Sequence, residues 1–278
     1  MSATDGAIRA DAFVCSYPKS GRTWMRFALA HYMRAVYGLE LDLELRTMFR
    51  LLPNMDGYAP DLGKDASVYA FADRPEIPLV LSSHMSFDER LFGRRPVVFI
   101  LRCPYDVMVS QYFQKTRQDF SWQGPLKAFL RDCEVGVADL VRYLNSWGPC
   151  LQTSRALVLT YEQLRRYPET GFLRLVAHLG IQTERAVARA ALSEASFGRM
   201  REVERRFGIE GYDYDWTDPE ARRVRRGQIG GYRDYLDEQD CRYISTECAR
   251  RLAPAARALL ERWGLAPWGV PTRLPGLR

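Results

Sequence analysis

The chain has few of the residues that build metal sites or disulfide frameworks. Its 278 residues include three histidines and six cysteines, and no two cysteines have the spacing Cys-x-x-Cys. A chain of this length buries a large core without disulfides or metals. We therefore expect reduced thiols and a cytoplasmic protein. His, Asp and Glu do not cluster at metal-ligand spacing, so we expect no bound metal.

Long apolar runs are also missing. No uninterrupted apolar stretch approaches the length of about 18 residues that a membrane-spanning helix needs, so we expect no membrane span. Residues 1–11 carry charges and lack an apolar core, so we expect no signal peptide. Positive charge is in excess, because 40 Lys and Arg against 34 Asp and Glu give a net charge of +6. This excess suits an anionic ligand such as a nucleotide, and it also suits nucleic acid.

Short apolar segments alternate with helical patterns along the chain. The strand-like segments, whose composition is typical of strands covered on both faces, are 13–17, 79–82, 97–101 and 156–160. The helical patterns are 24–36, 105–117, 125–147, 161–179 and 184–191. The alternation predicts one α/β domain over residues 1–278, with a central parallel sheet flanked by helices. Ligands of such sheets bind beyond the carboxyl ends of the strands.

Two segments depart from this alternation. Residues 38–77 are rich in Gly, Pro and Asp, and we expect an irregular excursion there that shapes an acceptor side. Residues 199–226 are rich in arginine and show little apolar patterning. We expect 199–233 to be a mobile cover over the ligand rather than part of the core.

A basic loop follows the first strand. Pro18 ends the strand, an apolar helical pattern begins at Trp24, and between them stand Lys19, Ser20, Gly21, Arg22 and Thr23. A strand, a tight turn and a helix N-terminus form an anion site, because free backbone N–H groups and the helix dipole point to one spot. The cations and hydroxyls add charge and donors, and the glycine permits close backbone approach. The ligand should be a phosphate or a sulfate. The loop is not a Walker A motif, because the lysine precedes the only glycine.

The order Tyr-Pro-Lys-Ser-Gly-x-Thr-Trp at 17–24 resembles the 5′-phosphosulfate loop of sulfotransferases that use 3′-phosphoadenosine 5′-phosphosulfate (PAPS). A second segment, Arg-x-Pro-x-Asp-x-x-x-Ser at 102–110, resembles the 3′-phosphate motif of the same family, with Cys103 in place of the usual Asn. Arg102 ends a strand and Ser110 lies in the second turn of the next helix, so both can hold a second phosphate.

Three further segments resemble the family in the same order along the chain. Residues 225–233 resemble its cover motif Arg-Lys-Gly-x-x-Gly-Asp-Trp-Lys, although Gly231 replaces the Asp; the resemblance implies that the cofactor is also bound by Arg225, Arg226 and Gly227. Residues 160–164 resemble a Tyr-Glu-Asp segment and imply that Tyr161 touches the adenine. Residues 195–197 resemble Thr-Ser-Phe and imply that Phe197, together with Trp24, gives the adenine aromatic surface.

His84 is the candidate base. It follows the strand at 79–82 and therefore lies on the ligand side, where an imidazole can take a proton from an attacking hydroxyl. His31 lies inside a helical pattern and His178 near a helix C-terminus, and both have a structural interpretation. The segment Ser82-Ser83-His84 also resembles the Lys-Thr-His of the family, whose histidine is the base. Ser82 stands where that motif has a lysine, so one cation is missing or is supplied elsewhere, for example by Arg22.

The resemblance implies a cytosolic-type sulfotransferase, which we expect to be a bacterial member with a P-loop-like nucleotide-binding fold. It would transfer a sulfuryl group from PAPS to a hydroxyl of a small-molecule or glycoside acceptor. His84 would be the base, Lys19 would stabilise the leaving oxygen, and 3′-phosphoadenosine 5′-phosphate (PAP) would be the product. We expect no nucleic-acid partner, and a homodimer remains open.

Two alternatives remain open at this point. A nucleotide-dependent phosphotransferase would require a Walker lysine, which the loop lacks, and an Asp that binds Mg²⁺. A nucleic-acid-binding protein would use the arginines at 199–226, but acids are interspersed there. The acceptor is not specified by the sequence; aromatic and apolar residues that are candidates for its pocket are Met85, Phe87, Tyr112, Phe113 and Phe120.

Overall fold

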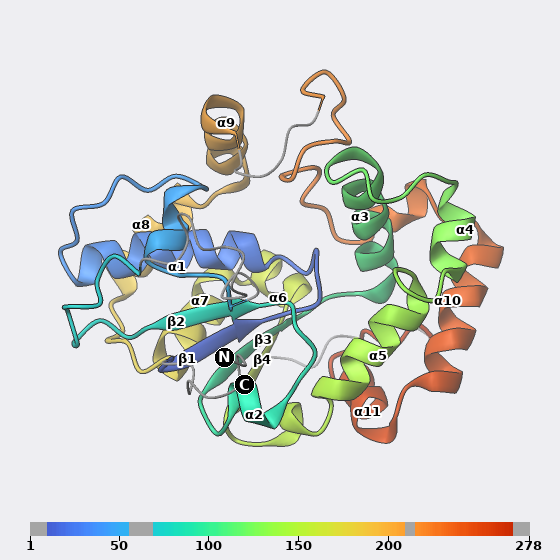
Figure 1. Ribbon diagram of the computed structural model, residues 1–278, viewed down its shortest axis with the longest axis horizontal. Helices are drawn as coiled ribbons and strands as arrows, with labels where there is room; N and C mark the ends of the chain where they lie inside the picture. Colours follow the sequence, from blue (N-terminus) through green and yellow to red (C-terminus); the bar gives the residue numbers. More distant parts are fainter. Residues whose placement is uncertain (1–9, 56–68, 209–214, 269–278) are drawn as a thin grey trace, which may run out of the picture.

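A parallel sheet forms the centre of the molecule (Figure 1). The computed structural model describes residues 10–55, 69–208 and 215–268. Within them, β1 (Ala12–Cys15), β2 (Val80–Ser83), β3 (Val97–Leu101) and β4 (Ala156–Thr160) pair in the order β2-β1-β3-β4, all parallel. The predicted single α/β domain with a central parallel sheet is confirmed.

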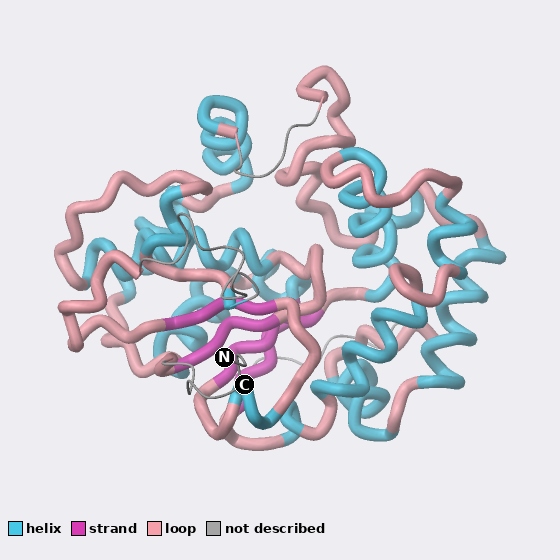
Figure 2. Tube along the Cα trace, in the orientation of Figure 1, coloured by secondary structure: helices cyan, strands magenta, loops and turns pink. Residues whose placement is uncertain are grey.

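Helices fill the connections between the strands and the C-terminal part of the chain (Figure 2). In chain order they are α1 (Arg22–Val36), α2 (Glu89–Phe92), α3 (Pro104–Arg117), α4 (Leu126–Arg131), α5 (Val137–Trp147), α6 (Tyr161–Arg166), α7 (Pro168–His178), α8 (Arg185–Glu194), α9 (Phe197–Phe207), α10 (Glu238–Arg251) and α11 (Pro254–Arg262). Within the described ranges, short 3₁₀ helices accompany them at 47–50, 150–152 and 231–234.

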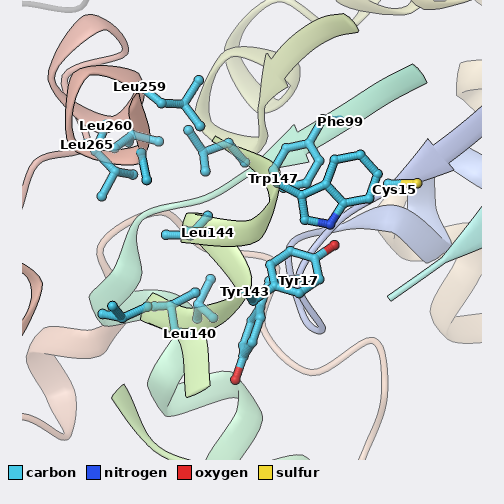
Figure 3. Close-up of a cluster of buried hydrophobic side chains, with 14 of the residues drawn as sticks. Cys15, Tyr17, Phe99, Leu140, Tyr143, Leu144, Trp147, Leu259, Leu260 and Leu265 are labelled. Carbon is cyan, nitrogen blue, oxygen red and sulfur yellow. The ribbon is translucent and has the colours of Figure 1, made fainter. Parts of the chain in front are cut away.

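The sheet is covered on both faces, as its unbroken apolar strands predict. Successive residues of each strand point to opposite faces, so Phe13 and Phe99 enter one apolar cluster and Val14 and Val98 enter the other. Helices α3, α5, α10 and α11 supply the first cluster, and α1, α7 and α8 the second. Trp147 lies at the centre of the first cluster beside Phe99, with 5.2 Å between ring centroids (Figure 3).

The strand order places a crevice at the carboxyl ends of β1 and β3. From β1 the chain moves outward to β2 and then crosses back over β1 to β3. The loops that leave β1 and β3 therefore diverge to opposite sides, and ligands of open α/β sheets bind where this happens. These loops are residues 16–21 and 102–103, which contain two of the predicted anion sites.

Two predicted helices are each divided in the structure. The helix expected over 125–147 is interrupted at 132–136, where the Asp132 carboxylate accepts from the backbone N–H groups of Glu134 and Val135 (2.8 and 3.1 Å) and turns the chain. The helix expected over 161–179 breaks before Pro168, which has no N–H to donate and begins α7. Both differences come from local turn chemistry inside a continuous apolar pattern.

The two irregular segments have more structure than the sequence predicts. The segment 38–77 contains the 3₁₀ helix at 47–50, and its residues 56–68 lie outside the described residues. The segment 199–233 begins within α9, and its residues 209–214 lie outside the described residues. Met200 and Glu204 of α9 are buried, which anchors this helix to the body of the protein.

Candidate active site

The loop after β1 is shaped to hold an anion. Lys19 and Gly21 both have positive φ (66° and 96°), and Gly21 is the N-cap residue of α1. A side chain at Gly21 would bring a Cβ to 2.7 Å from Cδ2 of Tyr161, so only glycine fits between the loop and this ring. No side chain of the described residues caps α1, so the N–H groups of its first turn suit an anionic ligand.

A cavity of about 340 Å³ opens at this loop. Its volume is in the range of small-molecule sites. Its walls include nearly all the predicted site residues, namely Lys19, Gly21, Arg22, Thr23, Trp24, His84, Arg102, Ser110, Tyr161, Phe197, Arg225, Arg226 and Gly227. These residues come from positions 19 to 227 of the sequence, and the fold brings them to one place. Ser20 is 2% exposed and is not part of these walls.

Arg102 joins the loop to the far segment. Its Nη1 donates to the Lys19 carbonyl oxygen (2.8 Å) and its Nη2 to the carbonyl oxygen of Gln228 (3.3 Å). Its guanidinium also lies over the Tyr161 ring, 4.3 Å from the centroid. Its Nε is buried and makes no hydrogen bond to any described residue. A half-buried cation whose Nε can still donate fits a second anionic group of the ligand.

Asp106 fixes the segment that covers the cavity. Its two carboxylate oxygens accept from the backbone N–H groups of Gly230 (2.7 Å) and Tyr232 (2.9 Å), and the side chain is 3% exposed. Gly227 has a φ of 62°, and a Cβ there would lie 2.7 Å from Cδ2 of Phe197. The cover therefore packs directly on the aromatic ring expected to contact the adenine.

Arg225 and Arg226 line the cavity but also have protein partners. Arg225 pairs with Glu220 (2.5 Å) and Arg226 with Asp234 (2.7 Å), and both donate to the Tyr235 hydroxyl (3.0 and 2.9 Å). These contacts hold two positive charges at the rim of the cavity. An entering anion would share the guanidinium groups with the carboxylates.

His84 lines the cavity, and one hydrogen bond fixes its tautomer. Its Nδ1 lies 2.7 Å from the Ser16 carbonyl oxygen, and because a carbonyl can only accept, Nδ1 carries the proton and Nε2 keeps its lone pair. Burial, and then the nearby Arg22 charge, lower the pKa of His84 well below its usual value; the bond to Ser16 opposes them. The ring is therefore neutral at neutral pH, which is the form that a general base needs.

Lys19 lies in a strongly cationic environment. Burial lowers its pKa well below the ordinary lysine value, and the charges of Arg223 and Arg225 lower it further. Bringing these cations together without an anion is unfavourable. The arrangement therefore favours a ligand with several negative charges.

Ser82, which stands where the family motif has a lysine, has two arginines nearby. Ser82 is 1% exposed and does not reach the cavity walls. Arg22 and Arg26, one turn apart on α1, both donate to the Asn54 Oδ1 (3.3 and 2.5 Å), and Asn54 forms a β-bridge with Ser82. Arg22 lines the same cavity as His84, and Asn54 holds its guanidinium.

The remaining candidates are placed away from the cavity walls. Phe87 packs on Trp147 (5.1 Å between centroids) and Phe113 on Tyr235 (5.0 Å), so both serve the core. Met85 and Phe120 are exposed, and Tyr112 packs on Phe129. Of the other histidines, His31 lies edge-on to Phe27, and His178 Nε2 is 3.0 Å from the Arg155 carbonyl oxygen. These contacts agree with their structural interpretation.

Several site residues were missed by sequence reasoning. On α3, the face that carries Ser110 also brings Gln111, Gln114 and Lys115 to the cavity, and i, i+4 spacing from Ser110 would have identified Gln114. Asp106, Arg165 and Arg223 also line it. Asp106 lay within the quoted motif, but its partners are 124 and 126 residues away in the sequence.

Comparison with known proteins gives the family. The sequence pattern of the family described as "Sulfotransferase domain" matches residues 9–255. This chain belongs to the sulfotransferase family. It is 23% identical over 235 residues to sulfotransferase 2A1 of Macaca fascicularis, covering 81% of this chain and 78% of the relative. It is 25% identical over 257 residues to cytosolic sulfotransferase 17 of Arabidopsis thaliana, covering 81% and 69%.

Solved structures share the sulfotransferase fold. Mouse sulfotransferase SULT7A1 complexed with PAP superimposes with a TM-score of 0.58 at 19% identity, covering 91% of this chain and 88% of that chain. Retinol dehydratase in complex with retinol and PAP gives a TM-score of 0.65 at 19% identity, covering 88% and 81%. The predicted P-loop-like sulfotransferase fold is thereby confirmed.

The described residues of this sulfotransferase contain neither a candidate membrane span nor a candidate metal cluster. None of the helices in the described ranges is both long and apolar enough to cross a membrane. Among the same residues, no three His, Cys, Asp or Glu side chains gather as a metal site. All six cysteines are free thiols. Lysine and arginine side chains and the α1 N-terminus contribute positive charge to the cavity.

Proposed function

We propose that this sulfotransferase uses PAPS as donor and transfers its sulfuryl group to a hydroxyl of a small-molecule or glycoside acceptor. The observation that supports this best is the presence of two cationic sites on one cavity. One is the loop 18–23 at the α1 N-terminus, and the other is formed by Arg102 and Ser110. PAPS carries anionic groups at both its 5′ and 3′ positions, which matches two sites in one cavity.

The aromatic lining suits the adenine between these sites. The rings of Trp24 and Tyr161 stand edge-on with centroids 6.1 Å apart, and Phe197 lines the same cavity. Gly21 and Gly227 press against two of these rings, so the backbone of both loops lies close to the space for the ligand. In this arrangement the nucleotide is held by stacking and by charge together.

The proposed reaction is an in-line displacement at sulfur. The acceptor oxygen forms a bond to sulfur while the bond between sulfur and the bridging oxygen of the phosphosulfate breaks. His84 Nε2 takes the acceptor proton, and the bonding electrons leave with the bridging oxygen. Lys19 stabilises the negative charge that grows on this oxygen. This interaction is stronger in the transition state than in the ground state, so it lowers the barrier.

The proposal allows several chemical classes of acceptor. A phenol, an alkyl alcohol, a natural product or a sugar hydroxyl would all serve as nucleophile. Retinol dehydratase was solved in complex with retinol and in complex with androsterone, and both of these ligands are apolar alcohols. Asn54 of the segment 38–77 reaches the cavity beside His84, which supports this segment as part of the acceptor side. Cytoplasmic location, bacterial origin and a homodimer remain predictions.

A transfer assay tests the proposal. Purified protein is incubated with PAPS labelled with ³⁵S and a panel of hydroxyl compounds from these four classes, and labelled products are separated. Transfer from PAPS without added Mg²⁺ supports the proposal. Phosphoryl transfer from Mg²⁺-ATP would instead support the phosphotransferase, and salt-dependent duplex binding in place of any transfer would support the nucleic-acid-binding protein.

A further inference from the structure

Arg223 is held in the cavity wall by a buried carboxylate. Glu204 on α9 is 1% exposed, and its two oxygens accept from the backbone N–H groups of Arg223 (2.7 Å) and Val224 (3.0 Å). Arg223 belongs to the segment that follows α9, and these two charge-assisted bonds fix its backbone. The side chain of Arg223 lines the cavity and is half-buried.

The charge of Arg223 acts on both proposed catalytic groups. It lowers the pKa of Lys19, where it is the strongest neighbouring charge, and it also lowers the pKa of His84. Lys19 belongs to the loop after β1, and His84 follows β2. Lys19, His84 and Arg223 all line the same cavity, so Arg223 adds a third element to the walls around the space through which the sulfuryl group would pass.

We propose that Arg223 is a further catalytic residue, whose guanidinium contacts the sulfuryl oxygens during transfer. This inference rests on the proposed function. As the acceptor–sulfur bond forms and the bridging bond breaks, negative charge is shared among the sulfuryl and leaving oxygens. The planar guanidinium presents parallel donors that match two such oxygens. The family motif has a lysine at the position of Ser82 on β2, and this chain lacks that positive charge. Arg223 of the cover segment supplies a positive charge in its place.

Arg22 has a different position. It is 5% exposed and donates to Asn54, and its charge is the strongest acting on His84. This placement suits orientation and electrostatic tuning of the base. Arg223 reaches the cavity from the cover segment, so its charge is added when this segment lies in place.

Arg223→Met tests the proposal, with Arg222→Met as the matched control. Arg222 is adjacent and half-buried, but it is not part of the cavity wall and donates to the Trp216 carbonyl oxygen (3.5 Å). Turnover with PAPS and calorimetric affinity for PAP are measured for each protein. We expect Arg223→Met to lower kcat roughly 100-fold or more, as removal of one oxyanion donor does, and to weaken PAP binding less than about threefold. Arg222→Met should keep both values.

The pH profile provides a readout that a merely structural role would not move. Removing a cation near His84 raises the pKa of this histidine, so the acid limb of kcat/KM should shift to higher pH in Arg223→Met and not in Arg222→Met. Arg223→Lys keeps the charge and should recover at least about tenfold of the lost kcat. This variant keeps the test decisive if Arg223→Met lowers the unfolding temperature.

Each result bears on the proposal. Unchanged kcat in Arg223→Met, or equal losses in kcat and in PAP affinity, would overturn it, as would an unmoved acid limb or no recovery with lysine. If the unmodified protein does not transfer sulfate from PAPS, the proposed function fails instead. The activity of the unmodified protein therefore separates the two failures.

Discussion

His84 shows how one hydrogen bond can assign a chemical role to a side chain. Its Nδ1 bond to Ser16 leaves Nε2 as the acceptor, and burial keeps the ring neutral. The sequence located this histidine past the end of a strand, which was sufficient to propose a base. Its tautomer could not be read from the sequence, because Ser16 lies 68 residues away and is brought near only by the pairing of β1 with β2.

Replacing His84 should lower the rate of sulfuryl transfer while nucleotide binding survives. His84→Ala should lower kcat by roughly 10²–10⁴-fold, while calorimetric affinity for PAP survives. Because the pKa of His84 is lowered, its neutral form persists below pH 6.5, so kcat/KM of the unmodified protein should remain level through pH 6.5 and fall only at more acidic pH. His178→Gln serves as control, since His178 contacts a backbone carbonyl outside the cavity. Near-normal turnover in His84→Ala would show that another group takes the proton.

Lys19 should matter more to the rate than to ground-state binding. Its charge meets a leaving oxygen whose negative charge grows during the reaction. Lys19→Met should therefore lower kcat at least about tenfold more than it weakens PAP binding. Steady-state kinetics and calorimetry provide both values, and Lys127→Met, at an exposed lysine paired with Asp237, is the control. Equal losses in the two measurements would make Lys19 a binding residue only.

Among the elements, the predicted bounds of the strands agree closely with the structure, and the predicted ends of the helices agree less well. β3 and β4 have the predicted bounds, because buried strands between turn residues leave little freedom. The breaks in the two long helical patterns depend on Asp132 and on Pro168, local signals that an apolar period hides. The order of the strands and the placement of α9 depend on contacts across the molecule. Local patterns therefore gave the elements, and long-range pairing gave their arrangement.

The contact between α3 and the cover segment should control nucleotide affinity. Asp106→Asn replaces a carboxylate that accepts two backbone N–H groups by an amide with one acceptor oxygen. Charged hydrogen bonds contribute roughly 1.5–3 kcal/mol each, so PAP should bind about tenfold more weakly or worse. Calorimetry measures the affinity, and trypsin should cut sooner at the arginines of 222–226. Glu238→Gln, at an exposed carboxylate on α10 paired with Arg242, is the control. Unchanged affinity and digestion would show that the cover holds without Asp106.

For the molecule as a whole, one ligand should connect both halves of the cavity. Adenosine 5′-phosphosulfate lacks the 3′-phosphate expected at Arg102 and Ser110, and should bind at least about a hundredfold more weakly than PAPS, since two charge-assisted contacts are lost. Arg102→Ala should remove most of this difference, whereas Arg117→Ala, at the far end of α3, should preserve it. Calorimetry with both nucleotides measures this. Comparable affinities in the unmodified protein would contradict the two-anion site.

The same ligand should stabilise the entire fold. A nucleotide that binds only the folded state at a hundred times its Kd adds about 2.7 kcal/mol to the free energy of unfolding. PAP should accordingly raise the unfolding temperature, and adenosine 5′-phosphosulfate at equal concentration should raise it less. Differential scanning calorimetry compares the two nucleotides directly.

The attachment of the cover segment to Asp106, Glu204 and Arg102 has a consequence for the catalytic cycle. The segment forms one wall of the nucleotide cavity, and these contacts close it against the loop after β1. Opening of these bonds would ease the departure of spent nucleotide. Product departure is accordingly expected to contribute to the length of each cycle, as in many enzymes whose active sites close over their ligands. Nucleotide product would then accumulate on the enzyme and act as its natural inhibitor.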